Sequence, residues 1–116
     1  MEAKAKFKVI FSEETITFLE NLPDKVRQKI MMNVMKSKYN LDPKLFKKLQ
    51  NTNLWEFRTF TNGIQYRLLA FWDHDEETFV ITTHAFVKKS QKTPLKEIAK
   101  AESIRKEYFK SKRVKK

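Results

Sequence analysis

The dipeptide Asn62-Gly63 constrains the fold of this chain more than any other feature of its sequence. It separates two β-rich runs, at residues 54–60 and 64–72. Asn-Gly between two such runs is the strongest short-range signal for a β-hairpin. The sequence therefore predicts two antiparallel strands joined by a two-residue loop.

This hairpin places two positive charges side by side. With Asn62-Gly63 as the loop, Arg58 lies directly opposite Arg67, and the Cβ atoms of such a pair are about 5 Å apart. Like charges at that distance repel each other. Two interpretations follow: an anion such as a phosphate binds between the guanidinium groups, or Glu56, on the same face, neutralises one of them.

Alternation along the hairpin separates a core face from a second face. The first consists of Trp55, Phe57, Tyr66, Leu68, Ala70 and Trp72, and the second of Glu56, Arg58, Arg67, Leu69 and Phe71. We expect the aromatic face to pack in the core, so the arginines should project from the opposite face.

The segments before the hairpin read as one strand and two helices. Residues 6–11 alternate as in a strand, residues 12–22 form a helix capped by Ser12, and a second helix starts at Pro23-Asp24 and runs to about residue 38. Its expected core stripe consists of Val26, Ile30 and Val34, with Met31 and Met35 beside it. Residues 39–53 form a connector, with a possible helical turn at Leu45, Phe46 and Leu49.

A third long strand and a last helix follow the hairpin. Residues 78–87 alternate, and Thr93-Pro94 starts a helix that runs to about residue 109. Its expected buried residues are Leu95, Ile98, Ala101 and Tyr108. The order β-α-α-β-β-β-α predicts an α+β fold, with an N-terminal strand and a helical hairpin packed on a small antiparallel sheet. We expect a single domain over residues 1–116, with a basic tail at about 110–116.

Composition excludes several classes of site. The chain has no cysteine, so it forms no disulfide and uses no thiol chemistry. Its two histidines lie far apart, at positions 74 and 84, and we expect no metal site and no cofactor. No run is long enough to span a membrane, and the N-terminus lacks the apolar core of a signal peptide. These features are typical of a cytoplasmic protein.

The charge is strongly and unevenly positive. The net charge is +11, and residues 86–116 hold 12 Lys and Arg against 3 Glu, a difference of +9. This predicts a polyanionic partner such as nucleic acid, although a solvated helix face would look similar. Lys88, Lys89 and Lys92 precede a helix N-terminus, which favours anion binding. Lys44, Lys47 and Lys48 either extend a basic groove or are solvated.

Proton-transfer groups are harder to identify. His84 lies near Arg67 in the expected sheet and is either a structural hydrogen-bonding residue or a catalyst. Tyr66 is a second candidate, although alternation directs it to the core. A lysine serves only if neighbouring cations lower its pKa well below the usual value of about 10.4.

Three segments resemble a known family. Leu-Trp-Glu-Phe-Arg at 54–58, Tyr-Arg at 66–67 and Phe-Val-Lys-Lys-Ser-Gln-Lys-Thr-Pro at 86–94 resemble the phage-derived Gp49-like proteins of the RelE/HigB toxin superfamily. The resemblance implies a RelE-like fold and the toxin of a type II toxin–antitoxin system. Such toxins are ribosome-dependent mRNA endonucleases that need no metal. In them a ribose 2′-OH attacks the scissile phosphate and leaves a 2′,3′-cyclic phosphate.

The resemblance also implies roles for individual residues. Arg58 and Arg67 lie in the basic hairpin, with Arg67 stabilising the scissile phosphate, and Lys88 and Lys89 match a Lys-Lys pair. The predicted catalytic set is Arg58, Arg67, His84, Lys88 and Lys89, and the predicted RNA-binding residues are Lys47, Lys48 and Lys92. The implied partners are mRNA on the ribosome, with rRNA contacts, and a helix-turn-helix antitoxin in a hetero-oligomer, for which Leu69 and Phe71 are candidate contacts.

Two other functions fit the same features. ParE-type members of the superfamily inhibit DNA gyrase on a similar scaffold, and an inactive basic RNA-binding module would also be strongly cationic. A pure binding module has no need of two arginines opposed on a sheet face, which favours the nuclease. The sequence does not indicate the cleaved codon, the general acid and base, or the antitoxin stoichiometry.

Overall fold

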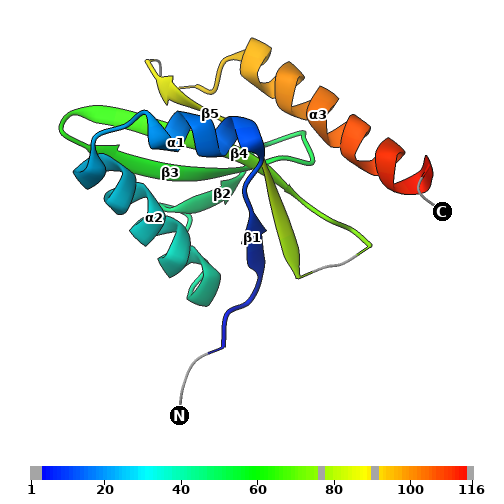
Figure 1. Ribbon diagram of the computed structural model, residues 1–116, viewed down its shortest axis with the longest axis horizontal. Coiled ribbons are helices and arrows are strands. Elements are labelled where there is room, and N and C mark those ends of the chain that lie inside the picture. The colour runs from blue at the N-terminus through cyan, green and yellow to red at the C-terminus, as the bar shows by residue number, and fades with distance from the viewer. Residues whose placement is uncertain (1–3, 76–77, 90–91, 115–116) are drawn as a thin grey trace.

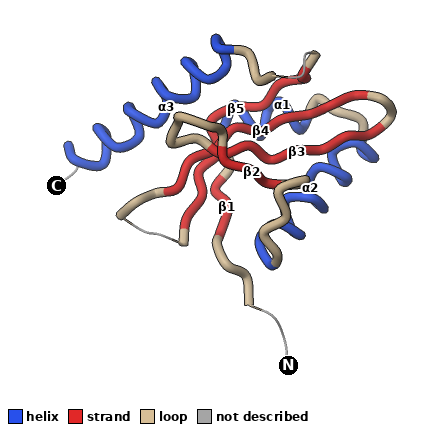
Figure 2. The backbone as a smooth tube through the Cα atoms, turned by 180° about the vertical axis from the view of Figure 1, so that it is seen from behind, coloured by secondary structure: helices blue, strands red, loops and turns tan. Residues whose placement is uncertain are grey.

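The computed structural model describes residues 4–75, 78–89 and 92–114, which form a five-stranded sheet with helices on both faces (Figures 1 and 2). The strand order is β1-β5-β4-β3-β2. The elements are β1 Lys8–Ile10, α1 Glu13–Glu20, α2 Asp24–Tyr39, β2 Phe46–Lys48, β3 Trp55–Thr61, β4 Ile64–Trp72, β5 Phe79–Lys88 and α3 Leu95–Val114. No helix in these ranges is long and apolar enough to cross a membrane.

The hairpin of β3 and β4 has the predicted loop and register. Asn62 and Gly63 have φ angles of 52° and 75°, and a two-residue loop with positive φ at both positions is a type I′ turn, which suits the twist of the strands. Arg58 pairs with Arg67 across the ladder. The prediction from the dipeptide is therefore confirmed.

The main core lies between the sheet and helices α1 and α2. Phe7, Phe46 and Phe57 are at most 2% exposed, and the Phe46 and Phe57 rings stack with centroids 4.3 Å apart. The expected stripe of α2 packs on the same face, whereas Met31 and Met35 are 39% and 53% exposed. The prediction that these two methionines lie in the core beside the stripe is wrong.

Two features of the sheet differ from the prediction. Residues 46–48 form β2, antiparallel to β3, where a helical turn was expected, because Phe46 stacks on Trp55 and Phe57. The sheet is also not wholly antiparallel, since β1 runs parallel to β5. Alternation shows which residues share a face but carries no information on strand direction.

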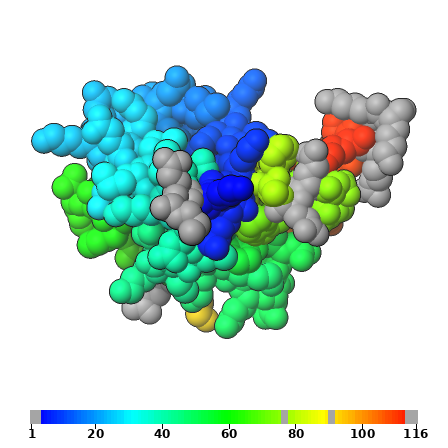
Figure 3. Space-filling model, turned by 90° about the horizontal axis from the view of Figure 1, so that it is seen from below, coloured from blue at the N-terminus to red at the C-terminus, as the bar shows by residue number. Residues whose placement is uncertain are grey.

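The N-terminal segment fills the space between α2 and β5. The Lys6 N–H donates to the Lys38 carbonyl at 2.5 Å, and the Lys8 N–H donates to the Thr78 carbonyl at 2.6 Å. In Figure 3 this dark blue segment lies between the cyan residues of α2 and the yellow-green residues at the start of β5. The end of the helical hairpin is thus attached to the sheet.

Helix α3 covers part of the opposite face and forms a second core. Leu69 and Phe71 are fully buried there, with Ala101 and Phe109 of α3. The prediction that Leu69 and Phe71 are exposed antitoxin contacts is therefore wrong. The helix begins one residue later than expected and extends through residues 110–114 of the predicted tail, whereas 115–116 lie outside the described residues. Leu95, expected to be buried, is 83% exposed.

The C-terminal half of α3 is attached to the end of β4. The Tyr108 hydroxyl donates to Asp73 Oδ2 at 2.5 Å, and Lys112 Nζ lies 2.7 Å from the same oxygen. Asp73 is fully buried. Since a buried carboxylate is costly unless it is paired, these contacts hold the C-terminal half of the helix on the sheet.

Candidate functional site

The two opposed arginines share one carboxylate. Glu56 Oε1 lies 3.2 Å from Arg67 Nε and 3.5 Å from Arg58 Nε. The Glu56 and Arg67 side chains are 3% and 4% exposed, whereas Arg58 is 31% exposed. Of the two interpretations of the arginine pair, neutralisation by Glu56 is thus partly realised, but one negative charge faces two positive charges.

Hydrogen bonds from β4 and from the segment before α3 orient this group. The Thr93 hydroxyl, just before α3, donates to Glu56 Oε2 at 2.6 Å. Arg67 donates to the Tyr66 carbonyl at 3.1 Å and to Gln65 Oε1 at 2.6 Å. The Arg67 Nε–H is buried and not aligned for a hydrogen bond, although it is within ion-pair distance of Glu56.

Lys88 adds a third cation to the group and, like Arg67, it is buried. It pairs with Gln65 across the β4–β5 ladder and is 9% exposed. Burial lowers its pKa, Glu56 opposes this effect, and the charges of Arg67, Arg58 and Lys47 lower it further. Burial also lowers the pKa of Arg67, with a further decrease from Arg58. Three positive charges thus surround the single carboxylate, and the cluster attracts anions.

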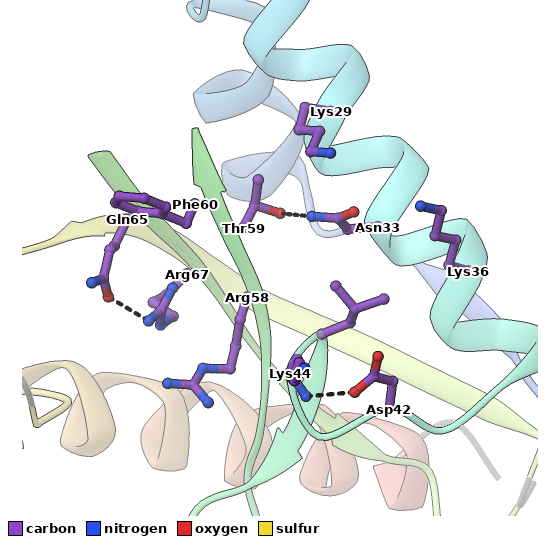
Figure 4. Close-up of a pocket in the computed structure, with 11 residues that line it drawn as sticks. Lys29, Asn33, Lys36, Asp42, Lys44, Arg58, Thr59, Phe60, Gln65 and Arg67 are labelled. Atoms are coloured by element: carbon purple, nitrogen blue, oxygen red, sulfur yellow. Dashed lines mark hydrogen bonds between the residues drawn. The ribbon is translucent and has the colours of Figure 1, made fainter. Parts of the chain in front are cut away.

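A basic groove leads away from this cluster along the edge of β3. The strand β2 pairs only with residues 55–57, so the edge beyond them faces a hollow of about 580 Å³. Its cationic lining consists of Lys29, Lys36, Lys44, Arg58 and Arg67, and the remaining residues are Asn33, Asp42, Leu45, Thr59, Phe60 and Gln65. Figure 4 shows Lys29 and Lys36 reaching from α2 on one side, with the arginines on the other.

The structure separates the predicted RNA-binding lysines. Lys47 pairs with Glu56 and so shares the face of the arginines, whereas Lys48 pairs with Trp55 on the opposite face. Lys89 is exposed just beyond the end of β5, and Lys92 is exposed in the segment that precedes α3. Residues 90 and 91, which precede Lys92, lie outside the described part of the chain.

His84 occupies a structural position on the same face. It pairs with Leu69 and is 1% exposed. Its Nδ1 lies 3.1 Å from Thr83 Oγ1, and its Nε2 lies 3.0 Å from Glu97 Oε1 of α3. Both ring nitrogens therefore have partners between the sheet and α3. Tyr66, the other candidate for proton transfer, is 5% exposed and belongs to the main core.

Several groups at the site had no assigned role in the sequence analysis. Glu56 was considered for one arginine and not for both, and Thr93 was expected only to start the last helix. No role was assigned to Lys29 and Lys36, because lysines between the core residues of an amphipathic helix are ordinary. Among the described residues, no three His, Cys, Asp or Glu side chains gather as they would around a metal ion. The arrangement is suited to binding and stabilising an anion.

Comparisons with known proteins agree on a family and a fold. Residues 17–106 match the family described as "Phage derived protein Gp49-like (DUF891)". No curated protein matches the chain significantly.

Solved structures with a similar fold are toxins and their complexes. The Mycobacterium tuberculosis toxin–antitoxin complex RelBE2 aligns with a TM-score of 0.56 and 21% identity, over 72% of this chain and 99% of that chain. A mutant of the Escherichia coli toxin RelE in the free state aligns with a TM-score of 0.55 and 19% identity, over 76% of this chain and 86% of that chain. The intact Escherichia coli RelBE complex aligns with a TM-score of 0.51 and 19% identity, over 76% of this chain and 100% of that chain.

Proposed function

This chain belongs to the phage-derived Gp49-like family and has a RelE-like fold, and from that premise we propose that it is the toxin of a toxin–antitoxin system. Its activity is that of an endoribonuclease that cleaves mRNA on the ribosome, and hence acts in the cytoplasm. The observation that carries this proposal is the pair Arg58 and Arg67, opposed across the hairpin with Lys88 beside them around the single carboxylate of Glu56.

The cation cluster fits the charge that develops during RNA cleavage. Attack of a 2′-OH on the adjacent phosphate forms the O2′–P bond and breaks the P–O5′ bond, through a phosphorane with extra negative charge. Cations placed in advance stabilise such charge strongly in a site that excludes water. Arg58 is the most exposed of the three and meets the phosphate first. The unaligned Nε–H of Arg67 is then available to the same phosphate.

Two groups of the cluster can move the protons. When a phosphate takes over the guanidinium groups, Glu56 Oε1 loses its arginine partners and can accept the proton of the 2′-OH. Lys88, whose pKa is lowered mainly by burial, can donate a proton to the leaving O5′ more readily than an exposed lysine. We assign these roles to Glu56 and Lys88 and a supporting role to His84, whose ring nitrogens contact Thr83 and Glu97. The resemblance implies no metal in this reaction.

The antitoxin has a candidate contact beside the groove. A hollow of about 390 Å³ at the end of α2 is lined by Met35, Tyr39 and Asn40 and shares Lys36, Asp42 and Leu45 with the groove. An antitoxin segment with apolar side chains for this hollow and acidic ones for the lysines would complement both, and would block the approach of RNA. The partner we propose is a helix-turn-helix protein that forms a hetero-oligomer with this chain.

Expression of the chain in a bacterial host tests the nuclease. The wild type should stop growth and produce new mRNA 5′ ends inside translated frames, whereas Arg67→Ala should be harmless. Removing one donor to a developing oxyanion costs about 10²–10³-fold in rate. Arg27→Ala is the control, because Arg27 is more exposed than Arg67 and forms an ion pair with Asp24, three residues before it on α2.

Other results would assign a different function. Growth arrest without new mRNA ends, together with a DNA-damage response, would indicate the gyrase inhibitor. Folded wild-type protein that neither stops growth nor cleaves mRNA would indicate an RNA-binding module.

A further inference from the structure

An exposed aromatic ring stands at the edge of the basic groove. Phe60 is 64% exposed and lines the groove together with Arg58, Gln65 and Arg67. It pairs with Gln65 across the hairpin, and Figure 4 shows the two side chains next to each other. An apolar ring left in water loses the free energy that its burial would supply. Phe60 therefore contributes little to the fold in this position.

The surroundings of Phe60 indicate the chemistry of its ligand. Arg58 precedes it by two residues on the same face, so the two Cα atoms are about 7 Å apart along an extended strand. This is close to the length of one extended nucleotide. Lys29, Lys36 and Lys44 continue the positive charge of the groove, against the single carboxylate of Asp42. A groove lined by several cations beside an aromatic face is the combination that binds single-stranded nucleic acid.

We propose that Phe60 is a base-stacking subsite for an unpaired nucleotide of the RNA, adjacent to the phosphate held by Arg58. The flanking strand then follows the groove toward α2, with its phosphates on Lys44, Lys36 and Lys29. The amide of Gln65, whose oxygen accepts from Arg67 at 2.6 Å, lies where it contacts the edge of the stacked base. The subsite deepens the proposed function, because it takes RNA as the ligand.

Binding of short RNA measures this subsite without ribosomes or cleavage. The probe is a labelled single-stranded hexanucleotide with 2′-O-methyl riboses, which lack the attacking hydroxyl, in low salt with anisotropy detection. Phe60→Leu should weaken binding on the order of tenfold, as expected for the loss of one base–aromatic stack, whereas Phe60→Trp should retain it. Ile64→Ala is the matched control, because Ile64 is also exposed on this hairpin but does not line the groove.

An abasic scan gives the decisive comparison. With an abasic residue at the stacking position, wild type and Phe60→Leu should bind equally, and at the other positions the difference should remain. Three results would each overturn the proposal. They are a loss of binding by Phe60→Leu that is the same at every abasic position, no loss of binding by Phe60→Leu on intact RNA, and no RNA binding by the wild type. A Phe60→Leu variant that binds RNA normally but loses the antitoxin would place Phe60 at a protein interface and would also overturn it.

The subsite and the nuclease can fail separately. Phe60-dependent binding by a wild-type protein that leaves ribosomal mRNA intact would support the subsite and contradict the endonuclease. Cleavage of ribosomal mRNA by the wild type, together with RNA binding that Phe60→Leu leaves unchanged, would support the endonuclease and contradict the subsite. Circular dichroism of each variant shows that it is folded, which the exposure of Phe60 leads us to expect.

Discussion

Arg67 Nε lies 3.2 Å from Glu56 Oε1, and both side chains are almost completely buried. Buried ion pairs stabilise a fold weakly, because removing both charges from water costs about as much as their attraction returns. Here Arg58 and Lys88 add positive charge around the same carboxylate. The cluster is better understood as a prepared anion site than as a stabilising element, and its members should respond differently to mutation.

Glu56→Gln should destabilise the free protein. The substitution leaves Arg58, Arg67 and Lys88 without their counter-charge, and breaking a buried ion pair on one side costs about 3 kcal/mol or more. Thermal melting in chloride and in sulfate measures this. Sulfate should raise the melting temperature of the variant more than that of the wild type, because the anion can occupy the place of the carboxylate. Glu14→Gln, which removes an exposed partner of Lys100, should change stability by less than about 1 kcal/mol.

Lys88→Met should stabilise the protein and abolish cleavage. Burial and the neighbouring cations lower the Lys88 pKa from its ordinary value of 10.5, so the charged lysine costs free energy in the native state. We expect a gain on the order of 1 kcal/mol at pH 7, from relief of a partly buried charge. Lys89→Met, at an exposed neighbour, should leave stability unchanged, and equal melting of the two variants would contradict the burial of the Lys88 charge.

The stability gain of Lys88→Met should shrink at alkaline pH. Between the lowered native pKa of Lys88 and 10.5, the unfolded chain holds a proton that the native state has released. Stability of the wild type therefore rises with pH in this window relative to the variant. Denaturation of both proteins at pH 7 and at pH 10 measures the difference between their free energies of unfolding. A difference that stays the same or grows toward pH 10 would show that the native pKa of Lys88 is not lowered.

Met35→Asp should weaken the complex with the antitoxin and leave mRNA cleavage intact. Met35 is 53% exposed and lines the hollow at the end of α2. A carboxylate at this position would lose the apolar contact and repel the acidic side chains of the proposed antitoxin segment. Met32→Asp is the control, because Met32 is 48% exposed on the same helix and does not line the hollow. Co-purification with the product of the neighbouring gene measures the effect. An equal loss in both variants would show that the hollow is not the specific contact.

Tyr108→Phe should loosen α3 from the sheet. Its hydroxyl donates to the fully buried Asp73 at 2.5 Å, and a hydrogen bond to a charged group contributes about 1.5–3 kcal/mol. Urea denaturation should show a loss in this range, whereas Tyr39→Phe, at a tyrosine 43% exposed, should show little. A Tyr108→Phe variant as stable as the wild type would mean that the other contacts of Asp73, which include Lys112 Nζ and the Asp75 N–H, suffice to satisfy its carboxylate.

The opposition of Arg58 and Arg67 was predictable from sequence because a hairpin is a local structure. A two-residue Asn-Gly loop sets the register of both strands, and alternation then assigns every residue of the hairpin to a face. The same local logic predicted the α1 and α2 helices. The family resemblance added the expected fold and the roles of these residues.

What covers each face was decided only by tertiary packing. Alternation placed Leu69 and Phe71 beside the arginines but could not show that α3 buries them. It also could not show that residues 46–48 form a strand, which directs Lys47 toward Glu56 and Lys48 away from it. Thr93 reaches Glu56 across 37 residues of sequence. Such contacts depend on the docking of whole elements, whose free energy comes from buried surface and not from local conformational preference.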